Sequence, residues 1–159
     1  MTGGNMHGFY NRILKIDLSQ KDFSIDTLGD EVAQSLLGGK GLCSQLLFDL
    51  NPPGVDPLSP ENCLIFATGP SAGSSIWGSC RYGVFTKSPQ TGFLGHSYSG
   101  GKLAIPMSRT GYDAMVIKGK AKKPIYIHIE NDEISFRDAS ALWGKGVFET
   151  NRLIREELG

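Results

Sequence analysis

Two cationic side chains lie in a glycine-rich stretch near the middle of the chain. Residues 79–101, SCRYGVFTKSPQTGFLGHSYSGG, contain Arg81 and Lys87 among small, turn-forming residues and few large aliphatic ones. Backbone N–H groups in glycine-containing turns can converge on an anion, and the missing side chains let a planar or phosphorylated ligand come close. Arg81 would add a rigid fork of hydrogen-bond donors, and Lys87 a more mobile charge. The stretch is therefore either a cradle for an anionic ligand or a loop whose glycines only permit tight packing.

Other reactive or bulky side chains favour structural roles. A single histidine in a loop, His96, is typical of a solvated or hydrogen-bonded residue rather than of a proton carrier. We expect Trp77 and Trp143 to fill volume in a core or an interface. Cys80 is expected to pack as a small residue, because nothing nearby in the sequence activates its thiol. The lysine-rich segment 118–124 predicts a solvated turn between strands.

Composition excludes several classes of partner. The chain has 159 residues, the size of one domain, with 40% hydrophobic and 20% charged residues, which are globular values. No stretch approaches the roughly 20 apolar residues of a membrane helix. Sixteen Lys and Arg balance 16 Asp and Glu, so we expect neither a nucleic-acid nor a membrane partner. Three widely spaced cysteines form no C-x-x-C metal motif, and the N-terminus lacks a signal peptide, so we expect a cytoplasmic protein.

Hydrophobic periodicity predicts an α+β fold with mostly antiparallel β-sheets and a few short helices. Residues 12–19 alternate between apolar and polar side chains, and with 23–27 they predict a hairpin. Asp30 is a plausible N-cap for a first helix that Gly38 and Gly39 end. The other expected elements are a helix over 41–50, strands over 63–67, 113–119, 124–130 and 133–138, and a helix from about 145 to the end.

Seven segments follow one another in an order that resembles the N-terminal domain of the tungsten-containing aldehyde:ferredoxin oxidoreductase family. The resemblance runs from about Phe9 to Leu158, so we expect a cofactor-seating domain over 9–159, truncated relative to the family. Residues 1–8 are expected to be a flexible N-terminus or an expression remnant. The matching segments are ILKIDLS, LLGGKGL, PLSPENCLIFATGP, CRYGVFTKSPQTG, SGG, GYDAMVIKGKAKKPIYI and DASALWGKG.

The resemblance assigns cofactor-binding roles within residues 79–101. In this family the domain forms two β-sheets related by an approximate twofold, on which two pyranopterins holding one tungsten (or molybdenum) are seated. The family's arginine between the pterin and a [4Fe-4S] cluster falls on Arg81. Its pterin-phosphate segment, Asn-Ser-Gly-Gly, falls on Tyr98, Ser99, Gly100 and Gly101. The first residue of that segment offers its backbone carbonyl to a magnesium ion, which implies a metal contact at Tyr98.

Three positions depart from the family pattern. Tyr98 replaces the usual Asn, a change that a main-chain carbonyl contact survives and a side-chain contact does not. Cys80 stands where the family usually has Gly, which brings a thiol near the cofactor. Pro106 interrupts the helix expected after the two glycines, so it must lie in the first turn or bend that helix.

The resemblance implies a part of an enzyme that oxidises aldehydes to carboxylic acids with ferredoxin as electron acceptor. The family's cluster cysteines and acid–base residues come later than residue 159, so we assign no catalytic residue and expect this chain alone to bind no metal and to be inactive. Its expected partners are the rest of the enzyme or a partner subunit, ferredoxin, the aldehyde and further copies in a homo-oligomer. Two alternatives stay open: a non-catalytic scaffold that pairs with a partner through an open sheet edge, and an independent nucleotide- or phosphate-binding module.

Overall fold

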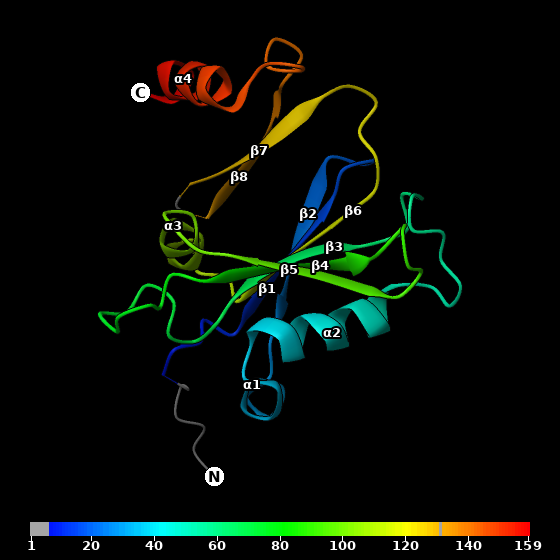
Figure 1. Cartoon of the computed structure of the whole chain (residues 1–159), viewed down its shortest axis with the longest axis vertical. Coiled ribbons are helices and arrows are strands. Elements are labelled where there is room, and N and C mark those ends of the chain that lie inside the picture. The colour runs from blue at the N-terminus through cyan, green and yellow to red at the C-terminus, as the bar shows by residue number, and fades with distance from the viewer. Residues whose placement is uncertain (1–6, 131) are drawn as a thin grey trace. The chain divides into compact units, whose positions relative to one another are not determined.

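The computed structural model of the chain describes residues 7–130 and 132–159 (Figure 1). These residues divide into two compact units, one that ends at Lys120 and one that begins at Ala121. Most of the expected N-terminal segment 1–8 lies outside the described residues. Among the helices that the structure describes, none is long and apolar enough to cross a bilayer.

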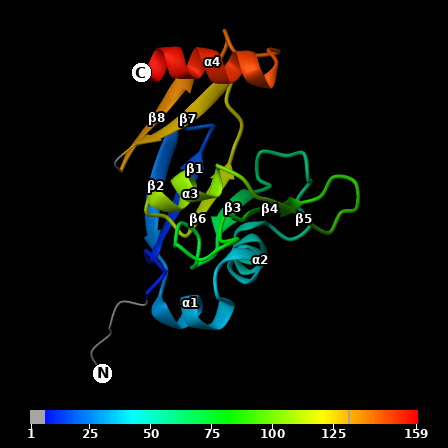
Figure 2. The same cartoon turned by 60° about the vertical axis from the view of Figure 1, so that its left-hand side comes forward.

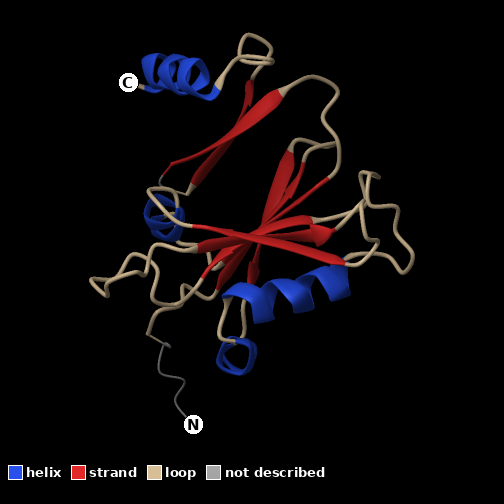
Figure 3. Ribbon diagram, in the orientation of Figure 1, coloured by secondary structure: helices blue, strands red, loops and turns tan. Residues whose placement is uncertain are grey.

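The first unit is built on a six-stranded sheet. Its strands are β1 (Arg12–Asp17), β2 (Asp22–Thr27), β3 (Leu64–Thr68), β4 (Tyr82–Lys87), β5 (Leu94–Ser99) and β6 (Ala114–Lys118). Their order across the sheet is β2-β1-β6-β3-β4-β5, and every neighbouring pair is antiparallel except β1 and β6, which run parallel. The mostly antiparallel α+β fold expected from the sequence is therefore confirmed, with short helices between the strands (Figure 3).

Three helices accompany this sheet in the described residues: α1 (Asp30–Leu36), α2 (Gly39–Leu50) and α3 (Ala104–Arg109). The predicted break at the double glycine is confirmed, since Leu37 ends α1 in the left-handed conformation and Gly38 follows at φ 69°. The expected N-cap is wrong by one residue. Gly29 occupies the cap position, and Asp30 is the first helical residue, where its carboxylate accepts a hydrogen bond from the Asn11 side-chain amide. Pro106 lies in the first turn of α3, one of the two places that its ring allows.

The main core lies between the sheet and α2. Figure 1 and Figure 2 both show α2 running along one face of the six-stranded sheet. Residues from four strands and from the helices α1 and α2 meet there, because alternate strand positions point to this face. The buried cluster comprises Ile13, Leu28, Ala33, Leu42, Cys43, Leu47, Cys63, Ile65, Ala67, Phe85, Ala114 and Val116. Leu14 and Ile16, which the alternation of β1 predicted to lie on a buried face, are 0% and 2% exposed.

A motif before β6 ties the start of β1 into the sheet. Gly111 has φ 80°, and the buried Tyr112 ring lies under the Arg12 guanidinium, whose carbon is 4.7 Å from the ring centroid. Asp113 accepts the backbone N–H groups of Tyr10 and Arg12, each at 3.1 Å. The sequence Gly-Tyr-Asp thus satisfies backbone donors that lie next to the parallel β1–β6 pair.

The second unit is a two-stranded sheet with one helix. Its elements are β7 (Ile125–Glu130), β8 (Glu133–Asp138) and α4 (Val147–Leu158). The predicted strands 124–130 and 133–138 are confirmed, and Asp132 in their connection has φ 67°, while Asn131 lies outside the described residues. Arg137 of β8 and Glu157 of α4 form an ion pair of 3.3 Å. Trp143, expected to fill volume, is 76% exposed and fills none in this unit.

The glycine-rich stretch is the largest difference from the expected elements. Strands β4 and β5 form an antiparallel hairpin within 79–101, a segment that the sequence left as a loop or cradle. Only Phe85 of this hairpin is a large side chain in the core, so the segment lacks the apolar alternation by which strands are recognised. Trp77, in the connection before β4, is fully exposed, so of the core and interface roles expected for it the core role is wrong, and the interface role stays a prediction.

Candidate functional site: one end of the β4–β5 hairpin

The hairpin brings the five residues that the sequence singled out to one place. Tyr82 lies opposite Ser99 and Gly83 opposite Tyr98, so the start of β4 and the end of β5 are side by side. One residue further along the same register, Arg81 faces Gly100. A Cβ atom added to Gly100 would lie 3.6 Å from both Cδ and Nε of Arg81, which shows that the arginine stem runs along the glycine backbone. We call Arg81 and Tyr98–Gly101 the cradle.

Arg81 presents an unpaired charge in this cradle. Its side chain is exposed, and within the described part of the chain it has neither an ion pair nor a hydrogen bond. Gly101 has φ 85°, a conformation that favours glycine, and a Cβ atom at this position would meet nothing within 4 Å. A free guanidinium beside open glycine backbone is an arrangement suited to an anionic ligand such as a phosphate.

The Tyr98 carbonyl is directed away from β4. In an antiparallel pair, residues alternate between those that exchange backbone hydrogen bonds with the partner strand and those that do not. The Ser88 N–H donates to the Phe93 carbonyl at 2.8 Å, which sets the phase of this alternation. Every second residue from Phe93, including Ser99, therefore bonds to β4, and the residues between them point their backbone groups to the open side. The Tyr98 carbonyl is thus available to a ligand or cation.

The Tyr98 side chain belongs to an aromatic cluster. Its ring packs edge-on against Phe85 and His96, with centroid distances of 5.8 and 5.5 Å, and Phe85 and His96 are stacked at 6.2 Å. Gly83 makes room for these rings, since a Cβ atom there would lie 2.5 Å from Phe85 and 3.1 Å from Tyr98. This packing explains how Tyr98 can replace the Asn of the Asn-Ser-Gly-Gly segment that the resemblance implies. The ring supports the end of the strand, and the backbone carbonyl remains free.

Lys87, the second cation expected near an anion, is not part of the cradle. It lies at the far end of β4, opposite Leu94, and its Nζ donates to the Val55 carbonyl at 2.5 Å. Its role is to hold the segment after α2 against the hairpin. His96, expected in a loop, is instead a strand residue stacked on Phe85.

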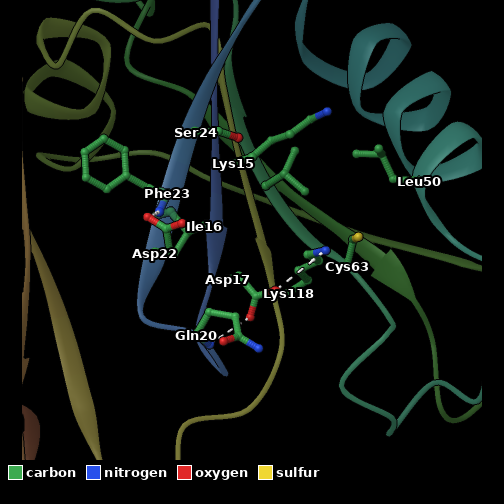
Figure 4. Close-up of a pocket in the computed structure, with 11 residues that line it drawn as sticks. Lys15, Ile16, Asp17, Gln20, Asp22, Phe23, Ser24, Leu50, Cys63 and Lys118 are labelled. Atoms are coloured by element: carbon green, nitrogen blue, oxygen red, sulfur yellow. Dashed lines mark hydrogen bonds and ion pairs between the residues drawn. The ribbon is translucent and has the colours of Figure 1, made fainter.

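The larger hollows of the described residues lie away from the cradle. One of about 310 Å³ is lined by the β1–β2 hairpin, β6, Cys63 and the end of α2 (Figure 4). Its charges neutralise one another: Lys118 pairs with Asp17 at 3.7 Å, and Lys15 pairs with Asp26 at 2.5 Å. Burial raises the pKa of the Cys63 thiol, and the two lysines only partly oppose that effect. This hollow therefore offers no unpaired lysine to an anionic ligand.

Protein side chains do not assemble a metal site in the part of the chain that the structure describes, where no three His, Cys, Asp or Glu residues cluster. A cation at the cradle would be held by the Tyr98 carbonyl together with oxygens of the ligand. Phosphate oxygens and backbone carbonyls are both ligands that magnesium accepts. The donor set therefore fits a phosphorylated ligand that carries its own divalent cation.

Comparisons with known proteins agree on one family. The family model described as aldehyde ferredoxin oxidoreductase, N-terminal domain, matches residues 13–159. Tungsten-containing aldehyde ferredoxin oxidoreductases of Pyrococcus furiosus and Thermococcus kodakarensis are 46% and 44% identical over 97% of this chain, which spans 26% of each. The WOR-like subunit of an aliphatic sulfonate oxidoreductase from Pyrococcus furiosus is 31% identical over 96% of the chain and 25% of its own length.

A solved structure shares the fold closely. The active site complex BamBC of benzoyl coenzyme A reductase, in complex with 1,5-dienoyl-CoA, contains a chain that superposes with a TM-score of 0.92 at 38% identity. The match covers 96% of this chain and 23% of that one. The chain described here thus spans about a quarter of the proteins that it matches.

Proposed function

Because this chain belongs to the aldehyde ferredoxin oxidoreductase family, whose N-terminal domain it matches over residues 13–159, we propose that it seats the cofactor of an enzyme that oxidises aldehydes to carboxylic acids. The cofactor is a bis-pyranopterin of tungsten or molybdenum, accompanied by magnesium. When bound, it supplies the redox chemistry, in which the aldehyde gains an oxygen from water and electrons leave through a [4Fe-4S] cluster to ferredoxin.

The unpaired guanidinium of Arg81 beside Gly100 is the observation that carries this proposal. The chain has no net charge, so attraction to an anion has to come from a local group rather than from the field of the whole molecule. In the proposal, Arg81 binds an anionic edge of the cofactor, and the backbone of Ser99, Gly100 and Gly101 approaches its phosphates. The Tyr98 carbonyl holds the magnesium.

The remaining parts of the enzyme are proposed to come from polypeptide beyond this domain. Relatives are about four times as long as the match, so the cluster ligands and the residues that move protons during aldehyde oxidation are assigned to the rest of the enzyme or to a partner subunit. The same proposal includes the domain over 9–159, ferredoxin as electron acceptor, a cytoplasmic location and assembly into a homo-oligomer.

One observation favours a second candidate function. The sheet of the second unit has only two strands in the described residues, so both of its edges are open to pairing. A non-catalytic scaffold would use these edges to bind a partner subunit. It would have no need for an unpaired arginine against glycine backbone, which is why cofactor seating is preferred.

A chimera tests the proposal. The matching N-terminal segment of the Pyrococcus furiosus relative is replaced by this chain, and tungsten in the purified protein is measured by elemental analysis. We expect the chimera to retain tungsten, because the cradle seats the cofactor. Hydrogen bonds to a charged group contribute about 1.5–3 kcal/mol, so Arg81→Ala should weaken cofactor binding by about tenfold to a hundredfold. Arg81→Lys keeps the charge without the fork of donors, so its cofactor affinity should lie between those of the unmodified chimera and of Arg81→Ala.

Arg155→Ala is the control, because Arg155 is also an exposed arginine but lies on α4 in the other unit. Circular dichroism establishes that each variant is folded. Two results would reject cofactor seating and support the scaffold function: a folded chimera without tungsten, or an Arg81→Ala variant with full tungsten content.

A further inference from the structure

The cradle forms where two connections of the chain approach each other. The pairing of β4 with β5 ends one residue before it would include Arg81 and Gly100. Arg81 is the last residue of the connection from β3 to β4, residues 69–81, and Gly100 begins the connection from β5 to α3. Because the strand ladder does not extend to this pair, the place of Arg81 along the glycine backbone depends on what holds the two connections together.

A buried serine of α3 joins the two connections. Ser108 is 5% exposed, and its Oγ donates to the Ala72 carbonyl at 3.0 Å. Gly73 permits this approach, since a Cβ atom there would lie 3.3 Å from Ser108 Oγ. In the described part of the chain, the other hydrogen bonds of 69–81 stay within that connection. The Ser108 hydroxyl is therefore the hydrogen-bonding tie between 69–81 and α3.

This tie differs from the usual hydrogen bond of a helical hydroxyl. Serine and threonine hydroxyls in helices often donate to a carbonyl three or four residues earlier in the same helix. Thr110, at the end of α3, does so and donates to the Met107 carbonyl at 2.7 Å. Ser108 instead donates to a residue 36 positions away in the chain. The two neighbouring hydroxyls thus provide a tie between segments and a matched bond within one helix.

We propose that Ser108 is a positioning residue of the cofactor site, which holds the connection 69–81 against α3 and so keeps Arg81 along the backbone of Gly100. Without the tie, this connection can open locally, and Arg81 is then away from the glycine backbone for part of the time. A side chain that is already in place loses less freedom when the ligand binds. The inference rests on the proposed cofactor seating, because Ser108 acts through Arg81.

The tie can be tested in the 159-residue chain without a cofactor. Cys80 is next to Arg81 and is partly exposed, whereas the other two cysteines are buried, so its alkylation rate by iodoacetamide measures how often the connection opens. Ser108→Ala should raise this rate by about twofold to tenfold, the effect of losing one neutral hydrogen bond. Ser108→Thr keeps the hydroxyl and should react like wild type. Thr110→Val, which loses the bond within α3, should also react like wild type.

The link from the tie to the cofactor can be tested in the chimera with the Pyrococcus furiosus relative. Ser108→Ala should lower the affinity for the tungsten cofactor by about twofold to tenfold, measured as tungsten retained during dialysis. In a chimera that already carries Arg81→Ala, the same change should lower the affinity no further. A residue that acts through Arg81 has no effect once Arg81 is gone, whereas an independent structural role would add its own loss.

The results separate this inference from the proposed function. Equal Cys80 alkylation in wild type and Ser108→Ala overturns the tie, as does an increase that Thr110→Val matches. Additive losses of tungsten in the double variant overturn the positioning role of Ser108 and leave cofactor seating intact. A folded chimera without tungsten rejects cofactor seating itself, whatever the alkylation rates show.

Discussion

Replacing Asp113 by Asn should destabilise the first unit by removing one acceptor from a buried site. The Asp113 side chain is 7% exposed, and its two oxygens each accept a backbone N–H, from Tyr10 and from Arg12, at 3.1 Å. An asparagine amide has one oxygen, so its NH₂ group would face one of these donors. The Asp113→Asn variant keeps the shape of the site but leaves one N–H of the chain entering β1 without an acceptor.

The expected loss of stability follows from this one backbone N–H without an acceptor. A buried donor without a partner costs about 1–3 kcal/mol, and for a chain of this size each kcal/mol lowers the melting temperature by about 2–4 °C. Asp56 provides the control, because its carboxylate accepts the Leu58 N–H at 3.0 Å in an exposed turn. Asp56→Asn should change the free energy of unfolding by no more than about 0.5 kcal/mol.

The pH dependence of stability gives a second, independent measure of what Asp113 contributes. Burial raises the pKa of Asp113, and the N–H groups of Tyr10, Arg12 and Asn11 only partly lower it. Between the ordinary Asp pKa of about 3.9 and the raised value, the folded chain binds more protons at this residue than the unfolded chain. Its contribution to stability is therefore present at lower pH and is lost as the pH rises through that window. Because Asn does not titrate, the difference in stability between wild type and Asp113→Asn should be larger at pH 4 than at pH 7.

Urea unfolding of wild type, Asp113→Asn and Asp56→Asn at several pH values measures both effects. Equal stability of Asp113→Asn and wild type would show that the N–H groups find other acceptors. A difference that grows with rising pH would show that the Asp113 carboxylate is favoured, not disfavoured, by its surroundings.

Two further predictions concern the hairpin and the thiols. Gly83→Ala should lower the free energy of unfolding by about 1–3 kcal/mol, because its Cβ atom would press on the fully buried Phe85 ring. Gly69→Ala is the control, because a Cβ atom at Gly69 meets nothing within 4 Å, and thermal melts in which both variants match wild type would refute this packing argument. Of the three cysteines, Cys80 should react first with iodoacetamide in the native chain, because Cys43 and Cys63 are buried and burial raises the pKa of Cys43 to about 12. Mass spectrometry would show the order, and equal labelling of Cys43 would contradict it.

The order of short segments along the chain was enough to indicate the family, which the comparisons confirm. Through the resemblance, it also indicated Arg81 and Tyr98–Gly101 as candidate cofactor-binding residues. Composition alone could not decide whether residues 79–101 form a cradle or a loop. Alternation of apolar and polar residues correctly predicted β1 and β2, an apolar run between turn signals predicted β3, and strand-forming residues predicted β6, β7 and β8.

The strands β4 and β5 could not be recognised in this way, because their stability comes from pairing with each other and with β3 rather than from their own apolar residues. The same pairing decides which cations share a site. Arg81 and Lys87 are six positions apart in the sequence, but the hairpin register sets Arg81 against Gly100 and carries Lys87 to the Val55 carbonyl at the other end.

Local sequence patterns therefore determined most of the strands and helices, though not β4 and β5, and indicated the family to which the chain belongs. The tertiary structure alone decided the strand order with its parallel β1–β6 pair, the meeting of Arg81 with Gly100, and the outward direction of the Tyr98 carbonyl. The physical reason is that a hydrogen-bonded register joins residues far apart in the chain, and a one-residue shift would reverse the direction of every backbone group and side chain along the strand.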